Sequence, residues 1–354
     1  MKKTYDLYIE KFIPLIAPSV LKSKIPLTQK AFETVFYGRQ SIQNILQKKD
    51  PRVLVIVGPC SIHDEKAALD YAKRLVQLQQ KVKDTFLLVM RVYFEKPRTS
   101  VGWKGLINDP CLNGSCDIHL GLKMARGLLL KILEMGLPTA SEVLDPIIPQ
   151  YIAGMICWAA VGARTTESQT HRELASGLSM PVGFKNCTDG GLSTAINAMI
   201  AAGSKQSFLG IDQDGRASIV KTTGNPFAHI VLRGGRRPNY DSVSIDEALN
   251  MLREKNLLSA IVVDCSHANS KKKYKAQVTA WQDVINQRIN GNDNIIGLML
   301  ESNINEGNQK NSADLASMKY GVSITDGCIS WETTADLILS AHDHLKHKHI
   351  YLNK

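Results

Sequence analysis

The stretch VLVIVGPCSIHD, residues 53–64, decides the fold. A short β-branched run at 53–57 ends at a Gly-Pro pair, and polar residues that include Cys60 follow at once. Runs of this kind are typical of buried strands. Residues 65–81 then place apolar side chains at helical spacing. The stretch therefore begins a βα unit, the element from which parallel sheets are built.

The same alternation repeats along the rest of the chain. Eight runs are predicted strands: 53–57, 86–92, 138–142, 158–162, 182–185, 229–232, 260–263 and 295–300. Helical spacing is found at 29–47, 65–81, 118–135, 192–202, 245–255, 276–289 and 333–344. Because eight strands that alternate with helices close into a barrel, the sequence predicts an α/β fold of the (β/α)8 TIM-barrel class.

Two segments lie outside this repeat. Residues 1–50 precede the first predicted strand and are expected to form an N-terminal extension for regulation or oligomer contacts. The runs 207–211 and 217–221 flank an Asp-Gly turn signal and predict a β-hairpin inserted at about 206–222. The remainder, 51–354, is expected to be one catalytic barrel, since α/β barrels of this length fold as single domains.

Composition excludes several classes of protein. Seven cysteines are scattered without the spacing of a disulfide framework, so most are expected to be free thiols. No run approaches the roughly 18 to 20 apolar residues of a membrane span, which predicts a cytoplasmic protein without membrane contacts. The net charge of +10 fits either a nucleic-acid surface or a site for anionic substrates. The lysine-rich run 271–275 is typical of a solvated loop or a helix start, so no nucleic-acid partner is expected.

Residues suited to binding phosphate or metal stand at the ends of the predicted strands. They are Cys60, Arg91, Lys96, Glu142, Arg164, Lys185, Arg233, His267 and Glu301. In a barrel the carboxyl ends of the strands share one face, so these side chains are predicted to meet there. Many of them are cations, and guanidinium groups suit bidentate binding of phosphate or carboxylate. The sequence therefore predicts an enzyme with anionic substrates.

Four residues have the character of a metal-binding set: Cys60, His267, Glu301 and Asp326. One thiolate, one imidazole and two carboxylates suit a divalent ion such as manganese, iron, cobalt or zinc. Spacing alone leaves His63, His119 and His171 as rival ligands. It also leaves the simpler interpretations that the cysteine is a small core residue and the histidine a hydrogen-bonding one.

Five blocks of sequence carry a family resemblance: GPCSIHD at 58–64, RVYFEKPRT at 91–99, GWKGL at 102–106, GARTTESQ at 162–169 and LRGG at 232–235. Together and in this order, they resemble the type I 3-deoxy-D-arabino-heptulosonate 7-phosphate (DAHP) synthases over nearly the whole chain. The resemblance implies a metal-dependent transferase that condenses phosphoenolpyruvate with D-erythrose 4-phosphate and water, giving DAHP and phosphate. This reaction is the first step of the shikimate pathway to the aromatic amino acids.

The resemblance also implies a role for each site residue. The implied metal ligands are Cys60, His267, Glu301 and Asp326, and the implied catalytic residues are Lys96, Cys60 and His267. Phosphoenolpyruvate is expected to contact Arg91, Lys96, Glu142, Arg164, Lys185 and Arg233. Erythrose 4-phosphate is expected to contact Lys96, Pro97, Arg98 and Thr99. Glu142 is expected to orient Lys185 or a water molecule.

Family members are often inhibited by an aromatic amino acid, bound between the N-terminal extension of one subunit and the hairpin region of another. Matching positions are Asp6, Ile9, Pro146, Gln150, Ser179, Phe208, Gly210 and Val220. Pro146 and Gly210 look most like the tyrosine-sensitive form, because glycine at 210 leaves room for a phenol hydroxyl. The resemblance suggests a homodimer or homotetramer.

Two alternatives remain open from the sequence. The related synthase that uses arabinose 5-phosphate shares the barrel and the phosphoenolpyruvate chemistry. It carries Lys-Ala-Asn-Arg where this chain has Lys-Pro-Arg-Thr at 96–99, which argues against that substrate. The non-enzyme alternative is a basic nucleic-acid-binding protein built on a barrel.

Overall fold

A closed barrel of parallel strands forms the centre of the molecule. The computed structural model describes residues 3–312 and 314–352. The barrel strands are β1 (Val53–Gly58), β2 (Phe86–Arg91), β3 (Thr139–Glu142), β4 (Trp158–Val161), β5 (Val182–Lys185), β8 (Ala228–Leu232), β9 (Ile261–Asp264) and β10 (Ile295–Glu301). They are ordered β1-β10-β9-β8-β5-β4-β3-β2, and β1 pairs with β2 to close the ring. The predicted (β/α)8 fold is confirmed.

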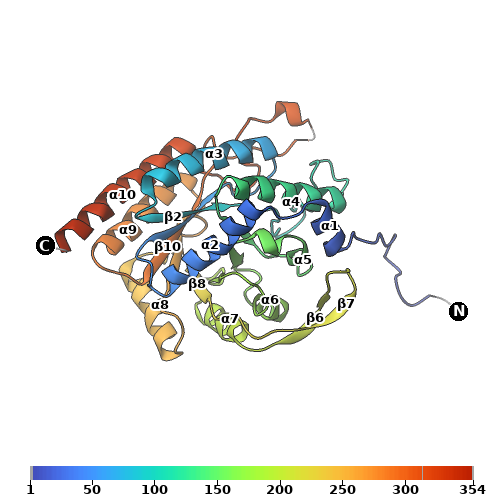
Figure 1. The fold of residues 1–354 in the computed structure, drawn as a ribbon, viewed down its shortest axis with the longest axis horizontal. Coiled ribbons are helices and arrows are strands. Elements are labelled where there is room, and N and C mark those ends of the chain that lie inside the picture. Colours follow the sequence, from blue (N-terminus) through green and yellow to red (C-terminus); the bar gives the residue numbers. More distant parts are fainter. Residues whose placement is uncertain (1–2, 313, 353–354) are drawn as a thin grey trace.

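Helices surround the barrel, with α3 and α10 on one side and α8 on another (Figure 1). The long ones are α2 (Gln29–Leu46), α3 (Glu65–Val82), α4 (Ile118–Glu134), α7 (Ser193–Gly203), α8 (Ser242–Glu254), α9 (Gln277–Ile289) and α10 (Trp331–Leu352). Shorter elements are α1 (Pro18–Lys24), α5 (Pro149–Ile152), α6 (Gln169–Ala175), η1 (Ala153–Met155), η2 (Tyr274–Ala276) and η3 (Leu315–Ser317). The short helices were not predicted, because one or two turns are too few to show helical periodicity.

Two additions flank the barrel. The hairpin of β6 (Ser207–Ile211) and β7 (Ala217–Lys221) lies beside α6, with Gly215 at φ 78° in its turn. The segment before α1 extends away from the body of the molecule (Figure 1), and Tyr8 on it is fully exposed. Residues 1, 2, 353 and 354, at the ends of the predicted extension and barrel, lie outside the described residues, as does residue 313.

The strands are buried on both faces because helices cover the outside and side chains fill the inside. Trp158 is fully buried, and its Nε1 donates a hydrogen bond to His229 Nε2 at 3.0 Å. Burial lowers the pKa of His229 to about 4, so this histidine stays neutral and can accept the bond. No helix in the described part of the chain is long and apolar enough to cross a membrane.

Candidate active site

A cavity of about 300 Å³ opens at the carboxyl ends of the strands. Its predicted members are Lys96, Pro97, Arg98, Thr99, Glu142, Arg164, Lys185, Arg233, His267 and Asp326. Cys60, Arg91 and Glu301 are not in its wall, but all three are buried. Cys60 and Glu301 lie against wall residues Lys96 and His267, and Arg91 contacts both Cys60 and Glu301. All thirteen predicted substrate and metal residues therefore lie in or directly beside one cavity, as expected from their positions at strand ends.

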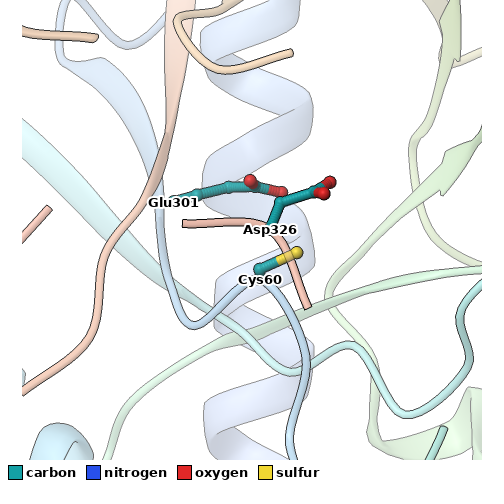
Figure 2. Close-up of side chains that lie close together, drawn as sticks. All are labelled: Cys60, Glu301 and Asp326. Carbon is teal, nitrogen blue, oxygen red and sulfur yellow. The ribbon is translucent and has the colours of Figure 1, made fainter. Parts of the chain in front are cut away.

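The pairing of β1 with β10 brings the first metal candidates together. Gly58 is in register with Glu301, so Cys60 leaves the barrel beside that carboxylate. Glycine is required at 58, because a Cβ there would lie 2.8 Å from the Arg91 carbonyl oxygen, and its φ is +153°. The donor atoms of Cys60, Glu301 and Asp326 all lie within 4.8 Å of one another and point to a common centre (Figure 2).

His267, the fourth predicted ligand, lies beside this cluster, after the neighbouring strand β9, but is not one of the three residues whose donor atoms group together. Its Nε2 lies 3.9 Å from Glu301 Oε1, while its Nδ1 lies 2.9 Å from Asp264 Oδ2. A histidine that binds metal through one nitrogen is commonly oriented by a carboxylate on the other. The residues present therefore fit a divalent ion. Neither His267 nor the rivals His63, His119 and His171 belong to the group of described residues whose donor atoms lie within 4.8 Å of one another. The support for His267 is its short distance to Glu301.

Lys96 lies over the Cys60 sulfur. Its Nζ is 3.1 Å from Cys60 Sγ and 3.2 Å from the Cys60 carbonyl oxygen. Burial and the nearby Glu301 carboxylate raise the pKa of the Cys60 thiol, whereas Lys96 and Arg91 lower it. Burial lowers the pKa of Lys96, but Cys60 and Glu301 outweigh it, so the net shift is upward and the ammonium stays charged.

Arg91 is held by a buried ion pair. Its Nη2 lies 2.8 Å from Glu301 Oε1, with both side chains almost fully buried. The guanidinium stacks on the Tyr93 ring, 3.5 Å from the ring centroid. Arg91 Nη1 has no hydrogen-bond partner among the described residues. A buried guanidinium nitrogen left unpaired in this way is suited to receive an anionic ligand.

Asp264, not Glu142, pairs with Lys185, so the expectation that Glu142 orients Lys185 is wrong. The alternative that Glu142 orients a water molecule stays a prediction. Lys185 Nζ lies 2.9 Å from Asp264 Oδ2, and both side chains are buried. Burial opposes ionisation of Asp264, but Lys185 and His267 outweigh it and hold the pKa of this carboxyl well below its usual range. Asp264 therefore links a predicted substrate residue to a predicted metal ligand, and the sequence interpretation missed it.

The predicted inhibitor residues form a second, separate groove. A cavity of about 230 Å³ beside the hairpin contains six of the eight: Pro146, Gln150, Ser179, Phe208, Gly210 and Val220. Asp6 and Ile9 do not line it within one chain. They lie on the segment that extends away from the barrel (Figure 1).

Glu95, next to Lys96, is a buried acid that sequence reasoning passed over. It is 5% exposed, and its Oε1 accepts a hydrogen bond from the Asp145 amide at 3.3 Å. Burial, reinforced by the Asp145 carboxylate, raises its pKa from 4.5 to about 8. It also lines a small internal cavity of about 20 Å³, together with Glu142 of the active site and Pro149 of the groove.

Replacing Glu95 with glutamine is expected to remove part of the pH dependence of stability. Because the folded pKa is raised, folding favours the protonated form, and this contribution is lost as pH rises from about 4.5 to about 8. Over that range the free energy of unfolding of the wild type should fall by on the order of 4 kcal/mol more than that of Glu95→Gln. Chemical unfolding of both proteins at pH 5 and 8 measures the difference. Glu247→Gln on the exposed face of α8 is the control, and an equal effect there would contradict the assignment.

These features define the class of the protein: a (β/α)8-barrel enzyme with a metal-capable cluster beside a cationic cavity for anionic substrates. The DAHP synthetase I family matches residues 24–338. The chain belongs to this family, the metal-dependent transferases that make DAHP at the start of aromatic amino-acid biosynthesis.

Individual relatives agree with this assignment. The chain is 53% identical over 331 residues to the Tyr-sensitive phospho-2-dehydro-3-deoxyheptonate aldolase of Escherichia coli (strain K12), covering 94% of this chain and 93% of that protein. It is 50% identical over 333 residues to the Phe-sensitive enzyme of the same organism, covering 94% and 95%. A solved structure of the aldolase from Francisella tularensis SCHU S4 has a TM-score of 0.93 at 43% identity, covering 96% and 99%.

Proposed function

We propose that this enzyme joins phosphoenolpyruvate to D-erythrose 4-phosphate. Carbon 3 of phosphoenolpyruvate attacks the aldehyde carbon of the acceptor, water adds at carbon 2, and phosphate leaves by carbon–oxygen cleavage. The observation that carries the proposal is the convergence of Lys96, Arg164, Lys185 and Arg233 on one cavity beside Cys60 and its carboxylate neighbours. Holding both anions in register supplies much of the rate enhancement for such a condensation.

The cationic residues divide between the two substrates. Lys185 and Arg233 are buried at the ends of neighbouring strands, where they would bind the phosphoryl group of phosphoenolpyruvate. Arg98 and Thr99 are exposed at the mouth, where they would bind the acceptor phosphate. Arg164 Nη2 donates a hydrogen bond to Thr99 Oγ1 at 3.3 Å. This bond links the residues proposed for phosphoenolpyruvate to those proposed for the acceptor. Lys96 would donate the proton that the aldehyde oxygen needs as the new bond forms.

Cys60, His267, Glu301 and Asp326 would hold the metal ion. When bound, a divalent ion supplies Lewis-acid polarisation of the aldehyde oxygen. The mixed thiolate, imidazole and carboxylate donors suit manganese, iron, cobalt or zinc. Which of these ions binds depends on which is available in the cell.

Assays with each aldose phosphate test the proposed reaction. The manganese-loaded enzyme, given phosphoenolpyruvate and erythrose 4-phosphate, should release phosphate in step with loss of phosphoenolpyruvate. Arabinose 5-phosphate should be a much poorer acceptor. Equal or better turnover with arabinose 5-phosphate would support the related synthase, and no phosphate release with either would contradict both. RNA binding is not expected in the same buffer.

We infer that tyrosine binds the groove beside the hairpin and inhibits the enzyme. Relatives named Tyr-sensitive and Phe-sensitive are similarly close to this chain, so the support for tyrosine is the glycine at 210. We also propose that the protein is cytoplasmic and forms a homodimer or homotetramer. The support for the oligomer is the extension, on which Tyr8 is 100% and Phe12 is 74% exposed. Contact with a second subunit would cover these apolar side chains and bring Asp6 and Ile9 to the groove.

Replacing Gly210 with alanine is expected to weaken tyrosine inhibition. An added Cβ would lie 2.9 Å from Val220 Cγ2, and overpacking of this kind costs roughly 1 to 3 kcal/mol, about a tenfold or greater rise in the inhibitory concentration. Turnover without inhibitor should be unchanged. Inhibition curves with tyrosine, phenylalanine and tryptophan measure the effect. Gly127→Ala in α4, whose Cβ would meet nothing within 4 Å, is the control. Stronger inhibition by phenylalanine than by tyrosine would contradict the inference.

A further inference from the structure

The loop after β9 contains an unusual concentration of left-handed backbone. His267, Lys271 and Lys272 have φ values of 56°, 51° and 58°. This conformation is unfavourable for residues other than glycine and is retained when the surroundings impose it, often at functional sites. Here it forms a tight turn, because the Lys272 amide donates a hydrogen bond to the His267 carbonyl at 2.7 Å and the Lys271 amide to that of Ala268 at 3.0 Å.

The turn directs one lysine of the run toward the active site. Lys272 lines the cavity at the barrel mouth, whereas Lys271 and Lys273 do not. Among residues 3–312 and 314–352, no carboxylate lies within ion-pair distance of the Lys272 ammonium. The run 271–275 was expected to be a solvated loop or a helix start, and Lys272 is indeed exposed. Its place in the wall of the cavity is a feature that the sequence did not indicate.

The charges in the cavity wall indicate a role for the Lys272 ammonium in binding the anionic substrates. The cations in its wall are Lys96, Arg98, Arg164, Lys185, Arg233 and Lys272, and the carboxylates are Glu142 and Asp326. Lys185 is already paired with Asp264, and Lys96 lies on the Cys60 sulfur. Each phosphate monoester brings a charge of about −1.5 to −2 at neutral pH, and phosphoenolpyruvate adds a carboxylate. A further unpaired cation therefore matches the charge that the two substrates carry.

The position of the loop indicates which substrate it faces. The Ala268 amide donates a hydrogen bond to the Arg233 carbonyl at 3.2 Å, so the turn is anchored on the strand-end segment that carries Arg233. In the barrel, β9 neighbours β8, whereas β5 and β8 separate it from β4, after which Arg164 lies. The loop that carries Lys272 is thus anchored at Arg233 and not at the exposed acceptor segment at 98–99.

We propose that Lys272 binds the phosphoryl group of phosphoenolpyruvate, together with Arg233. This inference rests on the proposed function and adds a substrate-binding residue to it. The left-handed turn is unfavourable for lysine, but it places the flexible Lys272 side chain at the cavity. The backbone hydrogen bonds at His267 and Ala268 hold the turn in place before the substrate arrives.

Steady-state kinetics on the manganese-loaded enzyme test the proposal. Lys272→Ala should raise the KM for phosphoenolpyruvate about tenfold, since one charge-assisted contact is lost. Its kcat and its KM for erythrose 4-phosphate should change less than about twofold. Lys272→Arg should restore most of the affinity, and Lys271→Ala and Lys273→Ala should behave as wild type. Lys272→Gly should weaken binding equally but raise Tm, because glycine relieves the left-handed strain.

The outcomes separate this inference from the proposed reaction. An unchanged KM for phosphoenolpyruvate in Lys272→Ala would overturn the inference, and so would a rise only in the KM for erythrose 4-phosphate. In either case an active wild-type enzyme would still support the proposed reaction. Calorimetric titration of the manganese-loaded proteins with phosphoenolpyruvate alone gives the same comparison without any acceptor. If wild type binds phosphoenolpyruvate about tenfold more tightly than Lys272→Ala yet fails to use erythrose 4-phosphate, the inference stands and the proposed acceptor is wrong.

Discussion

Replacing Cys60 with alanine is expected to lower turnover by roughly a thousandfold or more, because the variant loses a proposed metal ligand. In metal sites even residues that only contact a ligand affect metal affinity about 10- to 100-fold. The donor atoms of Cys60, Glu301 and Asp326 lie within 4.8 Å of one another, so the sulfur is one of the three donors that this cluster brings together. Calorimetric titration with manganese or zinc should show the loss of affinity directly, independently of activity.

Cys157→Ala is the matched control for this prediction. Cys157 is equally buried, but it lies at the start of β4, where its sulfur packs near Gly38 rather than near the cluster. This variant should lose some stability through the cavity it creates, yet keep metal affinity and turnover. If Cys60→Ala binds metal as tightly as Cys157→Ala does, the cluster is not the metal site.

The barrel was predictable because its strands are short β-branched runs bounded by glycine, proline and polar residues. Strand β5 and the hairpin strands β6 and β7 have the predicted bounds. The other strands differ by one residue at one end, except β9, which is shifted by one residue at both ends. Burial on both faces makes such runs nearly continuous in hydrophobic character, which is a strong local signal. Elements such as α5, with four residues, are set by tertiary packing and caps, and they leave no comparable pattern.

The site was predictable to the extent that it follows from topology. Residues at strand ends meet in a barrel whatever their sequence separation, which is how Cys60 and Glu301 could be grouped. Ion pairing and backbone conformation carry no such signal. Asp264 pairs with Lys185, 79 positions away, and the predicted strand stopped one residue short of it. The left-handed turn that brings Lys272 to the cavity is equally invisible in a run of lysines.

Replacing Lys96 with methionine is expected to lower kcat by about 10²- to 10⁴-fold, the range typical of a lost general acid. Methionine approximates the length of the lysine stem but has no charge and no proton to donate. Metal affinity should fall far less, by under about tenfold, since Lys96 contacts the Cys60 sulfur without replacing any donor. Turnover assays at saturating substrates, with manganese titrations of the same protein, measure both quantities.

The comparison of Lys96→Met with Lys96→Arg and Lys104→Met separates the two roles that Lys96 could have. Lys104 is exposed and belongs to the same segment, with its carbonyl accepting a hydrogen bond from the Lys96 amide, so its loss should leave kcat unchanged. Arginine keeps the positive charge beside Cys60 Sγ, but its very high pKa makes it a poor proton donor. If Lys96 only supports the thiolate, Lys96→Arg should recover both metal affinity and turnover. If Lys96 transfers the proton, Lys96→Arg should recover metal affinity alone, and intact turnover in Lys96→Met would contradict either role.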